Sequence, residues 1–214
     1  MLVSAFMKRM LVVACIFLGV STAIASEFDV AGRFGACLFD PVARLDHSNR
    51  NGNVDGARLV AVDVTLPLQV VGLSPKLSLE YQWTGFASEF PLTMKATVLS
   101  AALSRTMPLG YADVVVSGGL SYVVDKYNVD LVGRAPFTLT SRGAGMTIGC
   151  ELRFKFFDAA DAVVGYKYLR RGGVILESAG EQLDGEWLSE PYRIDGRNAA
   201  HCISFGVGFR VAGV

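Results

Sequence analysis

Charged residues are scarce in this chain of 214 residues: they make up 19% of the sequence, whereas apolar residues make up 51%. A soluble domain usually carries about 25% charged residues, and a disordered chain is poor in apolar residues. The 20 basic residues are balanced by 20 acidic ones. The composition therefore excludes a disordered chain and argues against the basic surface of a nucleic-acid-binding protein.

Patterns that would indicate catalysis or metal binding are also missing from the sequence. The two histidines are His47, in a polar segment, and His201, which alternation places on the opposite face of a strand from Ser204. A catalytic base and its nucleophile must lie within hydrogen-bond reach, and this arrangement prevents it. No metal-ligand spacing occurs, and the glycines of residues 143–149 lie inside a strand pattern instead of before a helix. We expect no enzymatic activity, no metal and no cofactor.

Long apolar runs are missing after residue 25, so the sequence predicts no membrane-spanning helix there. Near the start, a basic pair precedes an apolar stretch over residues 10–20, and an A-x-A pattern ends at Ala25. This arrangement is typical of a cleavable secretory signal peptide. We expect residues 1–25 to be the signal peptide and residues 26–214 to form an exported domain.

What the chain does contain is a repeated alternation of apolar and polar residues. From Ala144 to Phe156 every even position is apolar, and every odd position is glycine, threonine or a charged residue. Because successive side chains of a β-strand point to opposite faces, this pattern predicts a strand with one apolar face. The same pattern predicts eight strands, each about ten residues long, over residues 28–38, 60–70, 77–83, 94–102, 114–122, 144–156, 162–168 and 203–211.

The segments between these strands alternate between short and long. Short turns are expected near residues 72–75, 108–110 and 158–161, and long polar links over residues 40–56, 125–138 and 172–198. Short turns at one end and long loops at the other are typical of an outer-membrane barrel. A chain that enters a membrane as strands must close into a barrel, because unpaired backbone groups are too costly in lipid. The sequence therefore predicts an all-β fold: an eight-stranded antiparallel up-and-down transmembrane β-barrel with short periplasmic turns and long outer loops.

Alternation alone does not say which face points outward, and a soluble lipocalin-like barrel would also have eight alternating strands. The polar face is rich in glycine and serine, which suits a narrow lumen, and the charged fraction is low for a soluble protein. Aromatic residues of the apolar face fall near strand ends, as the interfacial girdles of a membrane barrel require. The residues of this expected girdle are Phe28, Phe154, Phe156 and Phe209 at the periplasmic end and Trp83, Tyr122 and Tyr168 at the other.

The polar face places charges of both signs in the predicted lumen. These residues are Asp63, Glu80, Asp113, Glu151, Arg153, Lys155, Lys167 and Arg210. Eight strands leave an interior that side chains fill, and buried ions must be paired. The charges are interpreted either as a salt-bridged plug or as a narrow polar passage. In the fourth strand, the least regular, Met94, Ala96, Val98 and Ala102 are expected to face lipid, opposite Lys95 and Thr97.

Two cysteines are expected to meet where the barrel closes. Pairing Phe28 of the first strand with Val211 of the last places Cys37 directly opposite Cys202. Both side chains are predicted to point inward, and an exported location permits a disulfide. The alternative is two buried thiols, because a cross-strand disulfide requires a close approach of the Cβ atoms. Cys150 is expected to face lipid without a partner.

The loop over residues 172–198 is the strongest candidate for a binding segment, because loops on a rigid scaffold often carry function. It contains Trp187 and Tyr192 among several acidic residues. Trp187 is interpreted either as a contact residue for a partner or as a side chain that folds over the barrel mouth.

Three segments give the chain a resemblance to the small eight-stranded outer-membrane barrels of the OmpA-like, opacity-protein and OmpW group. Residues 111–122 resemble the glycine-rich middle strand of that group, residues 143–154 with 164–168 resemble its sixth and seventh strands, and residues 204–211 resemble its closing strand. The group usually ends on an aromatic residue, whereas here five residues follow Phe209. The resemblance implies passage of small hydrophobic molecules, as in OmpW-like members, or adhesion through loops, as in opacity-like members.

We therefore expect an exported bacterial outer-membrane protein that forms a narrow channel for a small, hydrophobic solute. The alternative is an adhesin or structural barrel that binds host or partner molecules through its long loops, and a soluble ligand-binding barrel comes third. The expected partners are the lipid bilayer and the outer-membrane assembly machinery, together with a hydrophobic solute or host surface molecules, and no nucleic acid.

Overall fold

A computed structural model describes most of the chain after the expected signal peptide. It covers residues 28–46, 52–67, 72–84, 92–129, 137–171, 175–178, 182–183, 186–187, 192–195 and 199–211. Within these residues no helix is long and apolar enough to cross a membrane. The predicted signal peptide and His47 lie outside the described residues.

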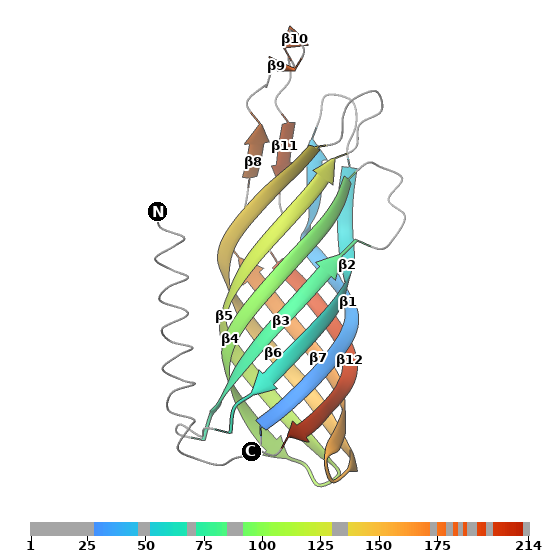
Figure 1. The fold of residues 1–214 in the computed structure, drawn as a ribbon, viewed down its shortest axis with the longest axis vertical. Helices are drawn as coiled ribbons and strands as arrows, with labels where there is room; N and C mark the ends of the chain where they lie inside the picture. The colour runs from blue at the N-terminus through green and yellow to red at the C-terminus, as the bar shows by residue number, and fades with distance from the viewer. Residues whose placement is uncertain are drawn as a thin grey trace.

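Eight strands form a closed antiparallel barrel (Figure 1). They are β1 (Phe28–Asp46), β2 (Gly52–Thr65), β3 (Ser74–Trp83), β4 (Leu92–Pro108), β5 (Ala112–Val129), β6 (Phe137–Phe157), β7 (Ala160–Arg171) and β12 (Ala199–Val211). Each strand pairs with the next, and β12 pairs with β1 to close the seam. The predicted fold class is confirmed.

The register at the seam is the one that the sequence predicts. Phe28 lies opposite Val211, and the pairing continues without a shift through Cys37 and Cys202 to Asp40. A shift by one residue would turn every side chain of the strand to the other face. The seam therefore keeps its apolar residues outside and its cysteines inside.

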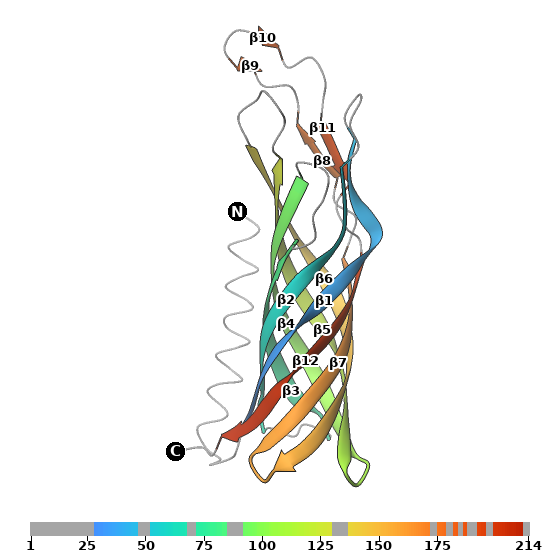
Figure 2. The same ribbon diagram turned by 90° about the vertical axis from the view of Figure 1, so that its right-hand side faces the viewer.

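Tight connections lie at one end of the barrel, which we call the lower end (Figure 2). Gly110 has a φ of 78° between β4 and β5, and Gly72 has a φ of 75° before β3. Glycine adopts this left-handed conformation without steric cost. We call the opposite end, which carries the long connections, the upper end.

At the upper end the structure departs from the predicted strand lengths. β5 continues to Val129 and β6 begins at Phe137, whereas the sequence pattern predicted an end at Tyr122 and a start at Ala144. The polarity of the alternation reverses here: Lys126 is exposed on the outside, and Tyr127 is buried inside. The pattern of apolar residues outside and polar residues inside therefore ends at this point, although the strands continue.

The long link after β7 also contains strands that the sequence did not predict. β8 (Ile175–Ser178) pairs with β11 (Tyr192–Asp195), and β11 extends the sheet by pairing with the upper end of β1. β9 (Gln182–Leu183) and β10 (Glu186–Trp187) form a small hairpin at the far tip (Figures 1 and 2). The candidate binding segment therefore projects beyond the barrel on paired strands.

The outer surface of the barrel has two zones. Most large apolar side chains of the lower zone are exposed, among them Phe34, Val62, Leu79, Leu99, Leu103, Leu120, Met146, Ile148, Ile203 and Phe205. Soluble monomers rarely expose apolar patches larger than a few hundred Å², and this coat surrounds the barrel. Above it the exposed residues are polar: Arg58, Thr93, Lys95, Thr97, Lys126, Thr138, Thr140 and Arg142.

The predicted orientation of the fourth strand was wrong. Met94, Ala96 and Val98 are buried inside the barrel and Ala102 lines the lumen cavity, whereas Lys95 and Thr97 are exposed on its outer face. The physical reason is that the upper part of β4 lies above the apolar coat. There the outside of the barrel is polar and the inside is apolar, as in a soluble barrel.

Candidate functional site in the lumen

Charged side chains of five strands meet in the lower lumen, where they form what we call the ionic cluster. Its members are Arg33 of β1, Asp63 of β2, Lys76 and Glu80 of β3, Glu151 and Arg153 of β6, and Lys167 of β7, and all are buried. Each occupies an inward position of an alternating strand. The polar face of the sequence pattern is thus the wall of the lumen.

Asp63 and Glu151 each bind more than one cation in this cluster. Arg33 Nη2 lies 2.7 Å from Asp63 Oδ2, and Lys76 Nζ lies 3.1 Å from the same oxygen. Lys76 also bonds to Glu151, and Arg33 Nη1 lies 3.5 Å from a Glu151 carboxylate oxygen. The four groups form a closed ring of alternating charge, which compensates for the cost of removing them from water.

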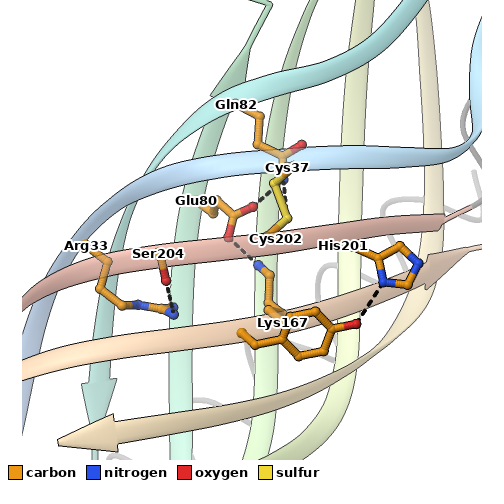
Figure 3. Close-up of a disulfide and its surroundings, with 9 residues drawn as sticks. Arg33, Cys37, Glu80, Gln82, Lys167, His201, Cys202 and Ser204 are labelled. Atoms are coloured by element: carbon orange, nitrogen blue, oxygen red, sulfur yellow. Dashed lines mark hydrogen bonds and ion pairs between the residues drawn. A yellow bond between two sulfur atoms is a disulfide. The ribbon is translucent and has the colours of Figure 1, made fainter.

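One branch extends the ring through Arg153, and a separate ion pair lies beside the ring. Arg153 Nη2 lies 3.3 Å from Glu151 Oε2, and Arg153 Nη1 lies 3.2 Å from Asp29 Oδ2. On the other side Lys167 forms an ion pair with Glu80, to which Gln82 also donates (Figure 3). Cations and carboxylates are therefore equal in number across this network, so its net charge is zero.

Three charges predicted for the lumen lie near its lower mouth. Lys155 Nζ is 3.3 Å from Asp113 Oδ2, and the Lys155 side chain is 44% exposed. Arg210 Nη2 is 3.8 Å from Asp161 Oδ1, and Arg210 also donates to a backbone oxygen of the turn between β6 and β7. These pairs are accessible to water, unlike the ionic cluster above them.

Sequence reasoning did not include Arg33 and Lys76 among the lumen charges, although they are central to the ionic cluster. Both lie on the polar positions of their strands, so the alternation rule was sufficient to find them. Asp125 and Arg171 were also missed. Arg171 Nη2 lies 2.9 Å from Asp125 Oδ2, and both are buried near the upper end of the barrel.

A disulfide joins Cys37 of β1 to Cys202 of β12 inside the barrel (Figure 3). The two sulfur atoms and a Glu80 carboxylate oxygen lie within 4.8 Å of one another. Oxidised sulfurs are poor metal ligands because metals bind the thiolate. The disulfide therefore links the first and last strands of the barrel covalently across the seam. Cys150 is a free thiol exposed on the outer face.

Above the disulfide the lumen is filled by what we call the apolar cluster. It consists of Cys37, Phe39, Val54, Ala57, Leu59, Ala61, Leu92, Met94, Ala96, Val98, Val123, Tyr127, Leu169, Ala200 and Cys202, with Leu139 packed against it. Tyr127 is fully buried, and its hydroxyl donates to Asp125 at 3.3 Å. The upper lumen is thus a packed hydrophobic core.

The cavity found between these groups is small. Its volume is about 20 Å³, and it is lined by Ser78, Ser100, Ser117, Thr147 and members of the ionic cluster. A volume of this size holds roughly one water molecule. This cavity is therefore too small to hold a solute.

Aromatic residues border the apolar coat on its outer face. The predicted girdle residues Phe28, Phe154, Phe156 and Phe209 lie at the lower ends of β1, β6 and β12, and Trp83, Tyr122 and Tyr168 lie at the upper border, all exposed or half-buried. Trp83 stacks on Tyr81 with ring centroids 5.8 Å apart. Tyr168 and Tyr166 contact His201, whose Nδ1 lies 2.8 Å from the Tyr166 hydroxyl. The candidate loop residues Trp187 and Tyr192 lie in β10 and β11, and their side chains are outside the described part.

A closed eight-stranded barrel with a polar lumen, an apolar coat and aromatic borders defines the fold class of the bacterial outer-membrane β-barrel proteins. No protein-family model and no curated protein sequence matches the chain. Comparison with solved structures supports the fold class directly.

Three of the similar structures cover nearly the whole barrel. A major outer membrane protein from Thermus thermophilus has a TM-score of 0.61 at 12% identity, over 88% of this chain and 100% of that one. The outer membrane protein OprG from Pseudomonas aeruginosa has a TM-score of 0.56 at 14% identity, over 86% and 96%. Neisserial surface protein A has a TM-score of 0.52 at 13% identity, over 85% and 96%. These likenesses establish the fold that the chain shares with these proteins.

Proposed function

We propose that the protein resides in the bacterial outer membrane as a barrel closed to solutes, and that it acts by presenting its upper strand extensions at the cell surface. The observation that carries the proposal is the filling of the lumen: the ionic cluster occupies the lower part, and the apolar cluster occupies the upper part. An eight-stranded barrel is narrow enough for side chains to fill it. The interior is thus suited to holding the wall rigid.

The outer membrane is the location that the outer surface fits. The apolar coat would be exposed to water in a soluble protein, whereas in a bilayer it contacts lipid tails. The aromatic borders match the two interfaces of the bilayer. Phase partitioning tests this location: the purified chain is expected to enter the detergent phase, and a monomer that stays in the aqueous phase would contradict it.

The segment that we propose to be presented is residues 172–198, which includes β8 and β11. Residues 172–198 contain six acidic residues and two arginines, so a partner with a basic surface fits this segment by charge. Its base is paired to β1, which holds it at a fixed place on the barrel rim. A rigid scaffold that carries a projecting loop is a common arrangement for binding.

Electrical recording tests the closed lumen. In planar bilayers the chain is expected to show no discrete conductance steps, and a double variant M94G/Y127G, which removes two large side chains of the apolar cluster, is expected to leak more than the parent. Regular conductance steps from the unmodified chain would contradict the proposal and favour the solute channel, which stays a prediction from the sequence.

Adherence of whole cells tests the presented segment. Replacing residues 181–188 by a glycine–serine linker removes the tip and leaves β8 and β11 in place. We expect cells that express this variant to lose adherence to epithelial monolayers, whereas the same linker in place of residues 131–135 is expected to have no effect. Equal adherence of both variants and the parent would refute a role of the tip.

A further inference from the structure

We propose that the disulfide between Cys37 and Cys202 is made before the seam of the barrel closes, by thiol–disulfide exchange with a separate protein that carries a reactive disulfide. The oxidation of these two thiols thus precedes the pairing of β12 with β1. The inference depends on the closed barrel and on the place of the disulfide inside it. It does not depend on the role of the upper strand extensions proposed above.

The closed barrel shields both sulfur atoms from a second protein. Cys37 is 1% exposed and Cys202 is 2% exposed, and their disulfide lies on the inner side of the seam between β1 and β12 (Figure 3). Thiol–disulfide exchange requires a thiolate to attack a disulfide sulfur directly, and it passes through a mixed disulfide between the two molecules. Two thiols enclosed by the barrel wall cannot form such a bond with a separate protein.

Side chains fill the lumen on both sides of the disulfide. Towards the lower end, Glu80 forms an ion pair with Lys167, and a Glu80 carboxylate oxygen lies within 4.8 Å of both sulfur atoms. Towards the upper end, Phe39 and Ala200 are buried two positions further along the same strands. A protein oxidant would have to displace these side chains to reach the sulfur atoms. The exchange therefore takes place while the inner side of the sheet is still accessible through an open seam.

A further cysteine indicates how far folding has advanced when the exchange takes place. Cys37 lies 165 positions from Cys202, whereas Cys150 lies roughly three times closer to Cys202 along the chain. The probability that a flexible chain closes a loop falls with about the 3/2 power of the loop length, so an unstructured chain would join Cys150 to Cys202 about five times as often as Cys37. The barrel nevertheless contains the pair with the longer loop, and Cys150 is a free thiol.

The paired sheet itself keeps Cys150 away from the two cysteines of the seam. Cys150 is exposed on the outer face of β6, between Val116 of β5 and Tyr166 of β7, whereas Cys37 and Cys202 are buried on the inner face. Side chains on opposite faces of a sheet point away from each other. The selection of the native pair therefore indicates a chain whose strands are already paired while its seam is still open. This open sheet is the substrate that we infer for the oxidant.

The exchange has two steps. The thiolate of one seam cysteine attacks the reactive disulfide of the oxidant, which forms a mixed disulfide and releases one thiolate of the oxidant. The thiolate of the other seam cysteine then attacks the chain's own sulfur in the mixed disulfide, which forms the Cys37–Cys202 bond and releases the oxidant as a dithiol. The chain loses two electrons and two protons, and the oxidant gains them.

Refolding of the purified full chain in detergent tests whether the oxidant needs an open seam. The chain carries C15S and C150S, so that Cys37 and Cys202 are its only thiols. A purified thioredoxin-fold protein in its disulfide form is added either at the start of refolding or after the reduced barrel has become heat-modifiable. We expect oxidation of the folded barrel to be about 100-fold slower, because it must wait for a rare local opening of the wall. Equal rates in the two experiments would overturn the inference.

A matched control moves the two thiols to the outer face of the same seam. Leu38 and His201 lie opposite each other one position along β1 and β12, and Leu38 is 67% exposed. The variant L38C/H201C, made with the four native cysteines replaced by serine, is expected to be oxidised at similar rates before and after folding. If it is slowed as strongly as the native pair, the detergent and not the lumen blocks the oxidant, and the inference is overturned.

Pulse labelling of whole cells, with rapid trapping of free thiols, gives the order of oxidation and closure during assembly. We expect newly exported chains to contain the Cys37–Cys202 disulfide while they are still sensitive to protease and not yet heat-modifiable. Folded barrels whose seam thiols are free and become oxidised later would contradict this order. Disulfides to Cys150 that appear before the native pair would contradict the paired sheet, because they would show that the oxidant acts on an unstructured chain.

Discussion

Replacing Asp63 by asparagine removes the charge that holds two cations of the ionic cluster. Asp63 is 1% exposed, and its carboxylate lies 2.7 Å from Arg33 and 3.1 Å from Lys76. Breaking a buried ion pair by removing one partner costs about 3–5 kcal/mol, because the other charge stays buried without compensation. We expect D63N to lower the free energy of unfolding by about 4 kcal/mol. Asparagine keeps the shape of the side chain, so the loss reports on charge.

Urea titration in detergent micelles, followed by tryptophan fluorescence and by heat-modifiable gel mobility, measures this loss. D113N is the matched control, because Asp113 pairs with the water-exposed Lys155 at the lower mouth, and such pairs contribute about 0–1 kcal/mol. D63N leaves one more cation than carboxylates in this network, and adding K76M removes that excess charge, so it is expected to restore part of the stability. If D63N and D113N unfold at the same urea concentration, the ionic cluster does not stabilise the barrel as we argue.

Three further changes have outcomes that the structure specifies. C37S opens the seam disulfide, and we expect a loss of about 2–4 kcal/mol in the same urea titration, matched by the parent under reducing conditions; an unchanged midpoint would contradict it. G119A places a Cβ atom 2.2 Å from a backbone oxygen of β4, whereas Gly118 has open space beside it. We therefore expect G119A, but not the control G118A, to reduce the yield of heat-modifiable barrel. Equal yields of the two variants would argue against the close approach. The orientation of β4 is tested with single-cysteine variants in a background that lacks the native cysteines. K95C is expected to react with a membrane-impermeant maleimide, and M94C is not. The opposite result would restore the orientation that the sequence predicted for the fourth strand.

The sequence predicts the fold well because one signal is repeated in eight places. From Ala144 to Phe156 the alternation runs without an exception, and the inside and outside faces of β6 follow it. The register at the seam follows from one assumed pair, because an antiparallel ladder without a bulge fixes all the others. These features depend only on local geometry, which the chain carries in every strand.

The orientation of β4 shows that the local sequence pattern does not determine which face of a strand points outward. An apolar residue such as Met94 satisfies alternation equally well against lipid or inside a packed core. Which one applies depends on where the bilayer ends along the strand, and that position is set by the neighbouring strands. β8 and β11 were missed for a related reason, since β11 pairs with the distant end of β1 and β8 is held by its pairing with β11.

The disulfide between Cys37 and Cys202 closes the chain of the barrel into a covalent ring. The two residues are 165 positions apart, so every strand from β2 to β7 lies within one closed loop of chain. A force applied to the two termini would unravel only the short tails outside the ring, and the load would then pass through the sulfur–sulfur bond. Reduction would release about 580 Å of further extension, at about 3.5 Å per residue. Under force the first and last strands therefore cannot separate, and the barrel wall cannot open, while the disulfide is intact.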